Sequence, residues 1–459
     1  MHSLRPPPQR CPVPIFSRRV IQGLIDRSPE FLSESQIPTF MGALNKNPAG
    51  VIPREWELAL LSALSKLGTL KYEPLLGGPR NPDILFSLET PLTGSFLAEI
   101  TTVSDKSADE ENPIEELRNE LSRLVKKRGL QPNHFSLTVG DDWQGIFHTG
   151  RNPRLKIPPK REFKSAVFTP KFDCFLSDIR ASPREARAYD VKTARVDLTI
   201  RYDHRQRFSS ASHLSYDIPY SLERNTVFKA LDKKARQLRL SGFPGPLGIF
   251  LCDGGCHVLA SSPRTFEITA GDIIRRFLGM HPFICFVQVF VIAVEWDMAR
   301  GTRRLALQAR LYEGRDFQTL PLRVRDVLPK LVAHMPEPED DPASARSTLM
   351  RWPETKGYPF RGRCTMTYKS AKFSARGLLD LLAGRVDQSE FLNHFGFTFG
   401  RESLPRPNFF ERLLREGRLI AGIGIERCPD KDDDWITITF SDPDPAITKF
   451  MPPRQSQKS

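Results

Sequence analysis

The sequence has few cysteines and no long uninterrupted apolar run. Its seven Cys residues are an odd number spread over 459 positions, which is too sparse for a disulfide scaffold and favours a reducing, cytoplasmic compartment. The longest apolar stretch, Pro282 to Val294, is interrupted by Gln288 and is shorter than the roughly 20 residues that cross a bilayer. The proline-rich, basic N-terminus lacks the continuous apolar segment of a secretory signal. We therefore expect no membrane partner, and we interpret 282–294 as a buried strand.

Several motifs of well-known enzyme classes are also missing. No G-x-S-x-G turn is present, so the sequence gives no support to a serine hydrolase of that type. The short run GGPR at 77–80 lacks the Gly-Lys-Ser/Thr of a phosphate-binding loop, which argues against an NTPase. Cys252, Cys256 and His257 have no matching second pair, so we interpret them as a tight Gly-Gly turn after a strand rather than a zinc site.

The composition is that of a folded chain with an excess of positive charge. Hydrophobic residues make up 39% of it, and Lys and Arg outnumber Asp and Glu by 67 to 54, a net charge of +13. Between residues 151 and 240 the counts are 21 and 10. This favours a polyanion partner such as DNA or RNA, with an ordinary basic face as the open alternative. The cations expected to bind nucleic acid are Arg151, Arg154, Lys156, Lys160, Arg161 and Lys164.

Changes in composition and periodicity divide the chain into parts. The predicted parts are a Pro-rich arm (1–50), an α/β core (51–330) with a basic insertion (about 151–215), an acidic Pro-rich linker (331–357), a small C-terminal α+β module (358–450) and a tail (451–459). Within the insertion, 168–175 and 196–202 are the strand candidates.

The core begins with a helix and a run of strands. Apolar residues at 56, 60, 61, 64 and 67 predict a helix with one buried face. Predicted strands follow at 72–76, 83–88 and 95–102, then a helix at 113–128, a strand at 134–139, a helix at 225–240, a strand at 246–251, a helix at 270–278, and strands at 283–295 and 305–311. The pattern indicates a mixed sheet flanked by helices.

Two carboxylates of this region are expected to converge. Alternation along the strand containing Glu99-Ile100-Thr101 places Glu99 and Thr101 on one side and Ile100 in the core. Asp83, at the start of the preceding strand, brings a second carboxylate to that side. Two such groups, completed by water and substrate phosphate, suit Mg²⁺ or Mn²⁺. Glu99 is the stronger of the two candidates, because a lone charge inside an apolar strand is costly.

The order of these residues resembles the PD-(D/E)xK superfamily, the restriction-endonuclease-like nucleases. The resemblance rests on Glu57 in the first helix, then Pro82-Asp83, then Glu99-Ile100-Thr101 on the next strand, and it spans roughly Pro53 to Glu295. It implies a restriction-endonuclease-like mixed sheet of about four strands flanked by helices. It also implies that Asp83 and Glu99 bind the metal and that Glu57 is an accessory ligand.

One departure from the family concerns its lysine, since this chain has Thr101 at the usual position. Either a lysine from elsewhere reaches the site, or the metal alone activates water, or the domain has lost catalysis. Lys234 on the later helix, Lys71 and Lys106 are the candidate lysines, and Thr101 and Gln237 complete the expected catalytic set. The structural alternatives are solvated helix-surface side chains for Glu57, Lys234 and Gln237, and turn chemistry for Asp83.

These observations predict a divergent Mg²⁺-dependent nuclease that hydrolyses phosphodiester bonds in DNA. The alternative is a catalytically inactive member of the fold that binds nucleic acid or a protein partner. A third hypothesis assigns the carboxylates a structural role and makes the C-terminal module a protein-interaction adaptor, through the acidic loop Asp430–Asp434.

Overall fold

We describe the chain from a computed structural model, in which it divides into two compact units. One unit is Leu60–Met335, and the other combines Met1–Ala59 with Pro336–Ser459. The structure describes residues 15–46, 50–76, 81–88, 94–142, 154–216, 218–219, 221–260, 268–297, 302–345, 365–367, 369–388, 391–392 and 409–448. A mixed sheet flanked by helices, together with smaller sheets, confirms the predicted α/β class.

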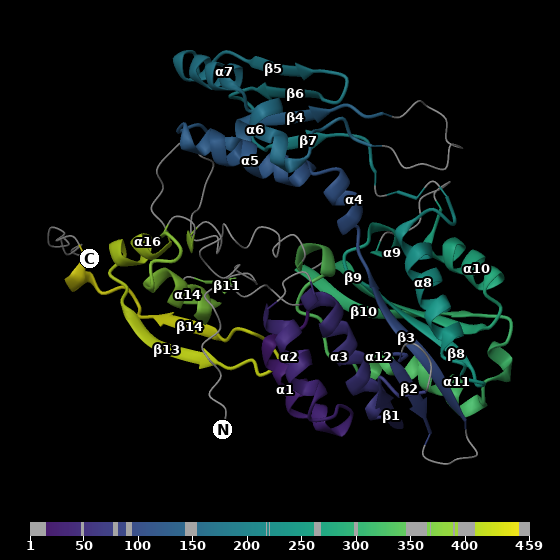
Figure 1. Ribbon diagram of the computed structural model, residues 1–459. Coiled ribbons are helices and arrows are strands. Elements are labelled where there is room, and N and C mark those ends of the chain that lie inside the picture. The colour runs from purple at the N-terminus through teal and green to yellow at the C-terminus, as the bar shows by residue number, and fades with distance from the viewer. Residues whose placement is uncertain are drawn as a thin grey trace. The chain divides into compact units, whose positions relative to one another are not determined.

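A six-stranded mixed sheet forms the main element of the unit Leu60–Met335 (Figure 1). Its strands in spatial order are β1 (Thr69–Tyr72), β2 (Ile84–Ser87), β3 (Ser95–Val103), β8 (Leu247–Asp253), β9 (Ile284–Asp297) and β10 (Thr302–Glu313). Strands β1, β2 and β3 are antiparallel neighbours, β3, β8 and β9 run parallel, and β10 pairs antiparallel with β9. Because β3 and β8 are parallel, the chain needs a long crossover between them, and this crossover contains helix α8 (Thr226–Leu240).

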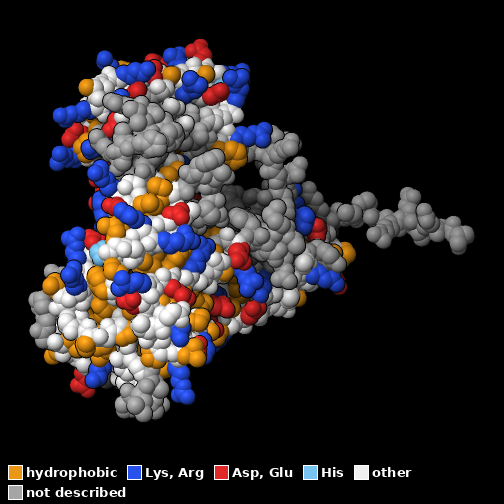
Figure 2. Space-filling view, turned by 90° about the vertical axis from the view of Figure 1, so that its right-hand side faces the viewer, with side chains coloured by type: hydrophobic (Ala, Val, Ile, Leu, Met, Phe, Trp, Pro, Cys, Tyr) orange, Lys and Arg blue, Asp and Glu red, His pale blue; other side chains and the backbone are white. Residues whose placement is uncertain are grey.

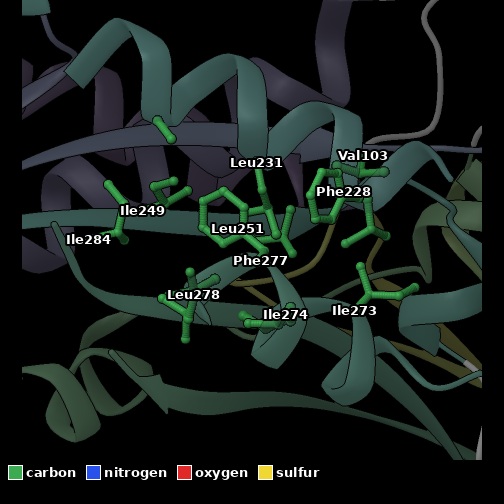
Figure 3. Close-up of a cluster of buried hydrophobic side chains, with 14 of the residues drawn as sticks. Val103, Phe228, Leu231, Ile249, Leu251, Ile273, Ile274, Phe277, Leu278 and Ile284 are labelled. Atoms are coloured by element: carbon green, nitrogen blue, oxygen red, sulfur yellow. The ribbon is translucent and has the colours of Figure 1, made fainter. Parts of the chain in front are cut away.

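Helices α8 and α10 (Ala270–Met280) pack against one face of the sheet. The side chains that meet there include Phe228, Leu231, Ile249, Leu251, Ile274 and Phe277 (Figure 3). Asn225 is the N-cap of α8, and its side chain accepts the backbone N–H of Phe228 and so caps the first turn. The predicted helix over 225–240 is thus confirmed, and its buried face fixes which side chains of α8 point towards the sheet.

The opposite face of the sheet is an aromatic layer. The Phe96 ring of β3 lies 5.2 Å from that of Phe86 in β2 and 5.4 Å from that of Phe286 in β9, measured between centroids. Since side chains alternate along a strand, Leu97 belongs to the other face and is buried in the α8 cluster. Glu99, two residues further, therefore faces α8 as well.

The insertion between β3 and α8 is built around a hydrophobic core of its own. Its helices are α4 (Lys106–Glu111), α5 (Ile114–Lys127), α6 (Phe163–Ala166) and α7 (Pro170–Ala181), and its strands in spatial order are β5 (Arg187–Lys192), β6 (Asp197–Tyr202), β4 (Phe135–Val139) and β7 (Ser210–Ser212). Leu117 of α5 and Leu137 of β4 share this core with Ile200 of β6. The packed insertion thus begins earlier than residue 151, because the sequence boundary follows charge, whereas the fold follows apolar contacts.

One strand prediction inside the insertion is wrong. The segment 168–175 lies mostly in helix α7, which begins with Pro170 and buries Phe172, Phe175, Leu176 and Ile179. Spacings of three and four residues are those of a helix face, and proline is favoured in the first turn. The aromatic residues of this segment suggested a strand, but their helical spacing decides the structure. The other strand, predicted over 196–202, is confirmed as β6.

The N-terminal segment, predicted as an arm, is packed from residue 15 onwards and contains helices from Arg18 onwards. Its helices are α1 (Arg18–Asp26) and α2 (Gln36–Lys46), followed by α3 (Val51–Ser65), which crosses the boundary between the two units. Ile15 and Phe16 are fully buried, and Phe16 packs edge-on against Trp56 of α3 at 5.5 Å. The first residues of the predicted linker join this packing, because Glu339 donates its backbone N–H to Ile15.

Within its described residues, the C-terminal module has a four-stranded sheet and accompanying helices. Its strands in spatial order are β11 (Thr365–Met366), β12 (Ser370–Ser374), β14 (Trp435–Phe440) and β13 (Ile420–Glu426), and its helices are α14 (Ala375–Leu382) and α16 (Phe409–Arg415). These elements give the described C-terminal residues the expected mixture of helices and strands, and the chain's contacts group them with Met1–Ala59 in one unit. Residues 346–364, 393–408 and 449–459 of the predicted linker, module and tail lie outside the described residues.

The remaining helices near the main sheet are short. They are α9 (His257–Ala260), α11 (Leu322–Val327) and α12 (Leu331–His334). Over the described ranges, no helix combines the length and the apolar character needed to cross a membrane.

Candidate active site

Asp83, Glu99 and Lys234 form a three-member ion cluster. The Lys234 Nζ lies 3.0 Å from Asp83 Oδ2 and 2.5 Å from Glu99 Oε2. Asp83 precedes β2, Glu99 lies in β3, and Lys234 lies in α8. The ammonium of Lys234 thus contacts Asp83, a residue 151 positions earlier in the sequence.

The sheet register brings the two carboxylates together. Ile84 pairs with Ala98 in the antiparallel ladder between β2 and β3. In this register, Asp83, one residue before Ile84, lies opposite Glu99, one residue after Ala98. The carboxylate of Asp83 also accepts the backbone N–H of Ile100 at 2.7 Å. Asp83 is therefore anchored to β3 by a main-chain hydrogen bond in addition to its ion pair.

The periodicity of α8 brings Lys234 to the same point. Leu231, Ala235 and Leu238 form the buried face of α8, and Lys234 borders this face between Leu231 and Leu238. Its side chain is 18% exposed, since the aliphatic stem is covered while the ammonium reaches the carboxylates.

Burial gives the cluster unusual proton affinities. Glu99 is 2% exposed, and its burial, together with the nearby Asp83 carboxylate, raises the pKa of Glu99 to about 8 despite the opposing effect of Lys234. Burial alone would lower the pKa of Lys234, but the two carboxylates outweigh it and raise that pKa. Lys234 therefore stays charged at neutral pH. Strongly perturbed groups that meet at one point are characteristic of functional sites.

Thr101 and Gln237 lie on the same two elements. Thr101 is two residues beyond Glu99, on the α8 side of β3, and is half-buried. Gln237 lies one helical turn after Lys234, and its Oε1 atom is buried without a hydrogen-bond partner in the part of the chain that the structure describes. A buried acceptor of this kind has capacity for a water or a ligand donor.

Glu57, the expected accessory ligand, lies in α3 and is 9% exposed. Its carboxylate pairs with the guanidinium of Arg54, and both residues belong to the unit that begins at Met1. Among the described residues, no group of three or more His, Cys, Asp or Glu side chains could hold a metal ion. A metal site at the cluster would therefore rely on the Asp83 and Glu99 carboxylates, with water and substrate as further ligands.

Over the described residues, neither of the other two candidate lysines forms an ion pair with Asp83 or Glu99. Lys71 is an exposed residue of β1, and Lys106 in α4 pairs with Glu110 at 3.7 Å. The sequence left three lysines as candidates for the cation. Of these, Lys234 is the one for which the described residues show contacts with both carboxylates.

The expected nucleic-acid contacts lie in the insertion. Arg154, Lys160, Arg161 and Lys164 are exposed, whereas Lys156 is half-buried, and Arg151 lies outside the described residues. Figure 2 shows Lys and Arg side chains spread over the face in view, with Asp and Glu between them. The positive charge on that face is thus interspersed with acidic side chains.

A second group of polar residues, which sequence reasoning took only as a turn, lies after β3 and β8. Asp253 accepts the backbone N–H groups of Gly255 and Cys256, both at 2.8 Å. Asp105 accepts the N–H of His257 at 2.7 Å. Burial raises the pKa of the Cys256 thiol well above its ordinary value, which keeps the thiol protonated and unreactive. These residues close the Gly-Gly turn, as predicted.

Comparison with known protein families, with curated proteins and with solved structures finds no match to this chain.

Proposed function

We propose that this chain is a metal-dependent nuclease of the PD-(D/E)xK type that hydrolyses phosphodiester bonds in DNA. The observation that carries the proposal is the meeting of Asp83, Glu99 and Lys234 at one point. A lysine beside two convergent carboxylates is the set of groups that the resemblance requires, and Lys234 supplies the positive charge that Thr101 lacks.

The order of elements supports the same reading. Helix α3 is followed by the antiparallel strands β1, β2 and β3, then by α8 and by β8 parallel to β3. A mixed sheet flanked by helices is the arrangement that the resemblance implies. The insertion separates β3 from α8 without disturbing their contact, because both elements contribute to one hydrophobic cluster.

The two carboxylates fit a hard divalent cation, since they already converge on a single positive charge. Asp83 and Glu99 would hold Mg²⁺ or Mn²⁺, which would supply Lewis acidity and an activated water. Glu99 must lose its proton to bind a cation, and Asp83 stays oriented by Ile100 while it does so. The Lys234 ammonium would neutralise charge on the phosphate that is attacked.

The insertion would hold the DNA backbone. Exposed Arg154, Lys160, Arg161 and Lys164 are suited to phosphate contacts, which position a nucleic acid without reading its sequence. Binding of this kind weakens steeply with salt because it releases counterions.

The proposal is tested by incubating the purified chain with plasmid and single-stranded DNA in Mg²⁺ or Mn²⁺. Cleavage should disappear with EDTA and fall at least about 100-fold in Glu99→Gln, Asp83→Asn and Lys234→Met, as expected for groups that stabilise the transition state. Lys233→Met, which changes the exposed neighbour on α8, should cut normally. Cleavage that survives Glu99→Gln would remove the site assignment.

A catalytically inactive, nucleic-acid-binding protein is the second candidate. The observation in its favour is that Lys234 already pairs with both carboxylates, so the cluster is also a satisfied buried ion pair. Salt-sensitive DNA binding with no cleavage under any metal condition would select this function over the first.

A further inference from the structure

The ammonium of Lys234 occupies the place that a cation shared by Asp83 and Glu99 would take. It lies 3.0 Å from Asp83 Oδ2 and 2.5 Å from Glu99 Oε2. We propose that Lys234 holds this place in the metal-free protein and that a divalent metal ion displaces its ammonium from both carboxylates. This inference rests on the proposed function, because the metal belongs to it.

The two cations compete because they use the same oxygen atoms. Mg²⁺ contacts carboxylate oxygens at about 2.0–2.1 Å and demands near-octahedral geometry. An ammonium that keeps its present contacts would then lie within a few ångströms of the metal, where two positive charges repel strongly in a buried site. Occupancy by one cation therefore excludes the other.

Lysine is the partner that can move. Glu99 is buried in the middle of β3, and Asp83 is tied to the Ile100 backbone. Lys234 is 18% exposed and has a flexible four-carbon stem. Its ammonium can therefore leave the carboxylates along a path towards solvent while α8 stays in place. The displaced ammonium remains near the site, where a substrate phosphate is the next available anion.

Displacement predicts that removal of Lys234 changes metal affinity in the direction opposite to that expected if the lysine only supported the carboxylates. If Lys234 only kept the carboxylates in position, its removal would weaken metal binding. If it competes, its removal leaves the oxygens of Asp83 and Glu99 open to the metal, which then has to displace only the proton of Glu99 and not the ammonium as well. The variant without the ammonium should then bind metal more tightly even though it is a poorer enzyme.

The experiment is a calorimetric titration of Mn²⁺ into the full chain and into Lys234→Met. We expect the Kd of Lys234→Met to be lower by about tenfold or more, and that of Lys233→Met to equal the wild-type value. An equal or higher Kd for Lys234→Met overturns the inference. Absence of Mn²⁺ binding in both proteins overturns the inference and the metal assignment together. Tighter binding by Lys234→Met in a protein whose wild type does not cut DNA supports the inference and removes only the nuclease activity.

A second measurement needs no substitution and covers the case in which Lys234→Met fails to fold. The wild-type chain is treated briefly with an amine-acylating reagent, with and without saturating Mn²⁺, and modified lysines are quantified by mass spectrometry. Displacement predicts that Mn²⁺ increases modification of Lys234 several-fold while Lys233 is unchanged. Unchanged or reduced modification of Lys234 in the metal-bound protein contradicts it.

Discussion

Asp83 accepts the backbone N–H of Ile100, with 2.7 Å between Oδ2 and N. Ile100 directly follows Glu99 in β3, so this hydrogen bond holds the Asp83 carboxylate beside the Glu99 carboxylate by main-chain geometry. The same Asp83 oxygen also accepts from Lys234. The Asp83 carboxylate is thus held in place by a main-chain hydrogen bond as well as by Lys234.

Two substitutions separate the contribution of the hydrogen bond between Asp83 and Ile100 from that of the Asp83 charge. Asp83→Asn keeps an oxygen that can accept the Ile100 N–H, whereas Asp83→Ala leaves that amide without its partner. We expect Asp83→Ala to lower the free energy of unfolding by about 1–3 kcal/mol more than Asp83→Asn does. Urea unfolding followed by circular dichroism measures this difference. Equal stabilities for the two variants would show that the Ile100 hydrogen bond contributes nothing.

A second buried acid, Glu55 in α3, makes stability depend on pH. Glu55 is 2% exposed and accepts the backbone N–H of Ile15 at 2.8 Å. Its burial raises the pKa of Glu55 to about 8 even though the backbone hydrogen bonds act against the shift. The folded pKa thus lies above the ordinary value of 4.5. The stabilisation is complete below the ordinary pKa and is lost as the pH rises through about 8.

Glu55→Gln should therefore gain stability relative to the wild type as the pH rises. Between the two pKa values, Glu55 contributes a slope of at most about 1.4 kcal/mol per pH unit, which the neutral amide removes. Glu99 adds a slope of the same sign, so some pH dependence should remain. Urea unfolding at pH 5.5, 7 and 8.5 provides the comparison. Parallel curves for the two proteins would contradict a shifted Glu55.

The acidic loop Asp430–Asp434 is largely engaged within its own unit. Asp433 accepts the Ser374 hydroxyl and, at 2.9 Å, the Arg376 backbone N–H. Asp432 accepts the backbone N–H of Arg18 at 2.6 Å. These carboxylates thus accept hydrogen bonds from backbone N–H groups in the first turns of α14 and α1. An adaptor role for the module would need a surface other than these carboxylates.

Loss of the Asp433 side chain should therefore destabilise the module. Asp433→Ala removes acceptors from the start of α14 and should cost about 1–2 kcal/mol, the usual range for a helix cap. Asp430→Ala changes an exposed residue of the same loop and should stay within about 0.5 kcal/mol of the wild type. Chemical unfolding of the full chain checks both values. Equal effects of the two substitutions would argue that loop charge, and not capping, matters.

The elements of the main sheet were predictable because each has a strong local signal. The alternation in FLAEIT and the helical spacing in NTVFKALDKKARQLRL place Glu99 and Lys234 on defined faces without knowledge of the fold. Their contact could not be deduced from spacing alone, since it depends on the crossover that returns α8 to β3 after the insertion. The resemblance to a nuclease family named Lys234 as one of three candidates, and packing distinguishes it from the other two.

The insertion and the N-terminal segment were harder to predict for physical reasons. Leu117 and Ile200 are far apart in sequence, so nothing local indicates that they share a core. Ile15 and Phe16 are isolated apolar residues among prolines, and their burial depends on Glu55 and Trp56 of a later helix. Contacts between residues far apart in the sequence determine the structure of the insertion and of the N-terminal segment.

The acidic residue Glu120 offers a final test of the proposed DNA-binding surface. Its hydrogen bond with Arg123, and then the nearby Lys164 and Lys160, hold the pKa of Glu120 below its ordinary value. Glu120 therefore neutralises part of the positive charge that the insertion presents to a phosphate backbone.

Glu120→Gln should release that charge and tighten DNA binding. We expect the Kd for a labelled duplex to fall by about three- to tenfold at low salt, with a salt dependence steeper by up to about one counterion. Glu115→Gln, whose partner is Arg118 in the same helix, removes the same formal charge as its control. Fluorescence anisotropy over a series of KCl concentrations measures both. Equal tightening in the two variants would mean that net charge acts at a distance, whereas tightening confined to Glu120→Gln would assign the DNA path to the surface around Lys160 and Lys164.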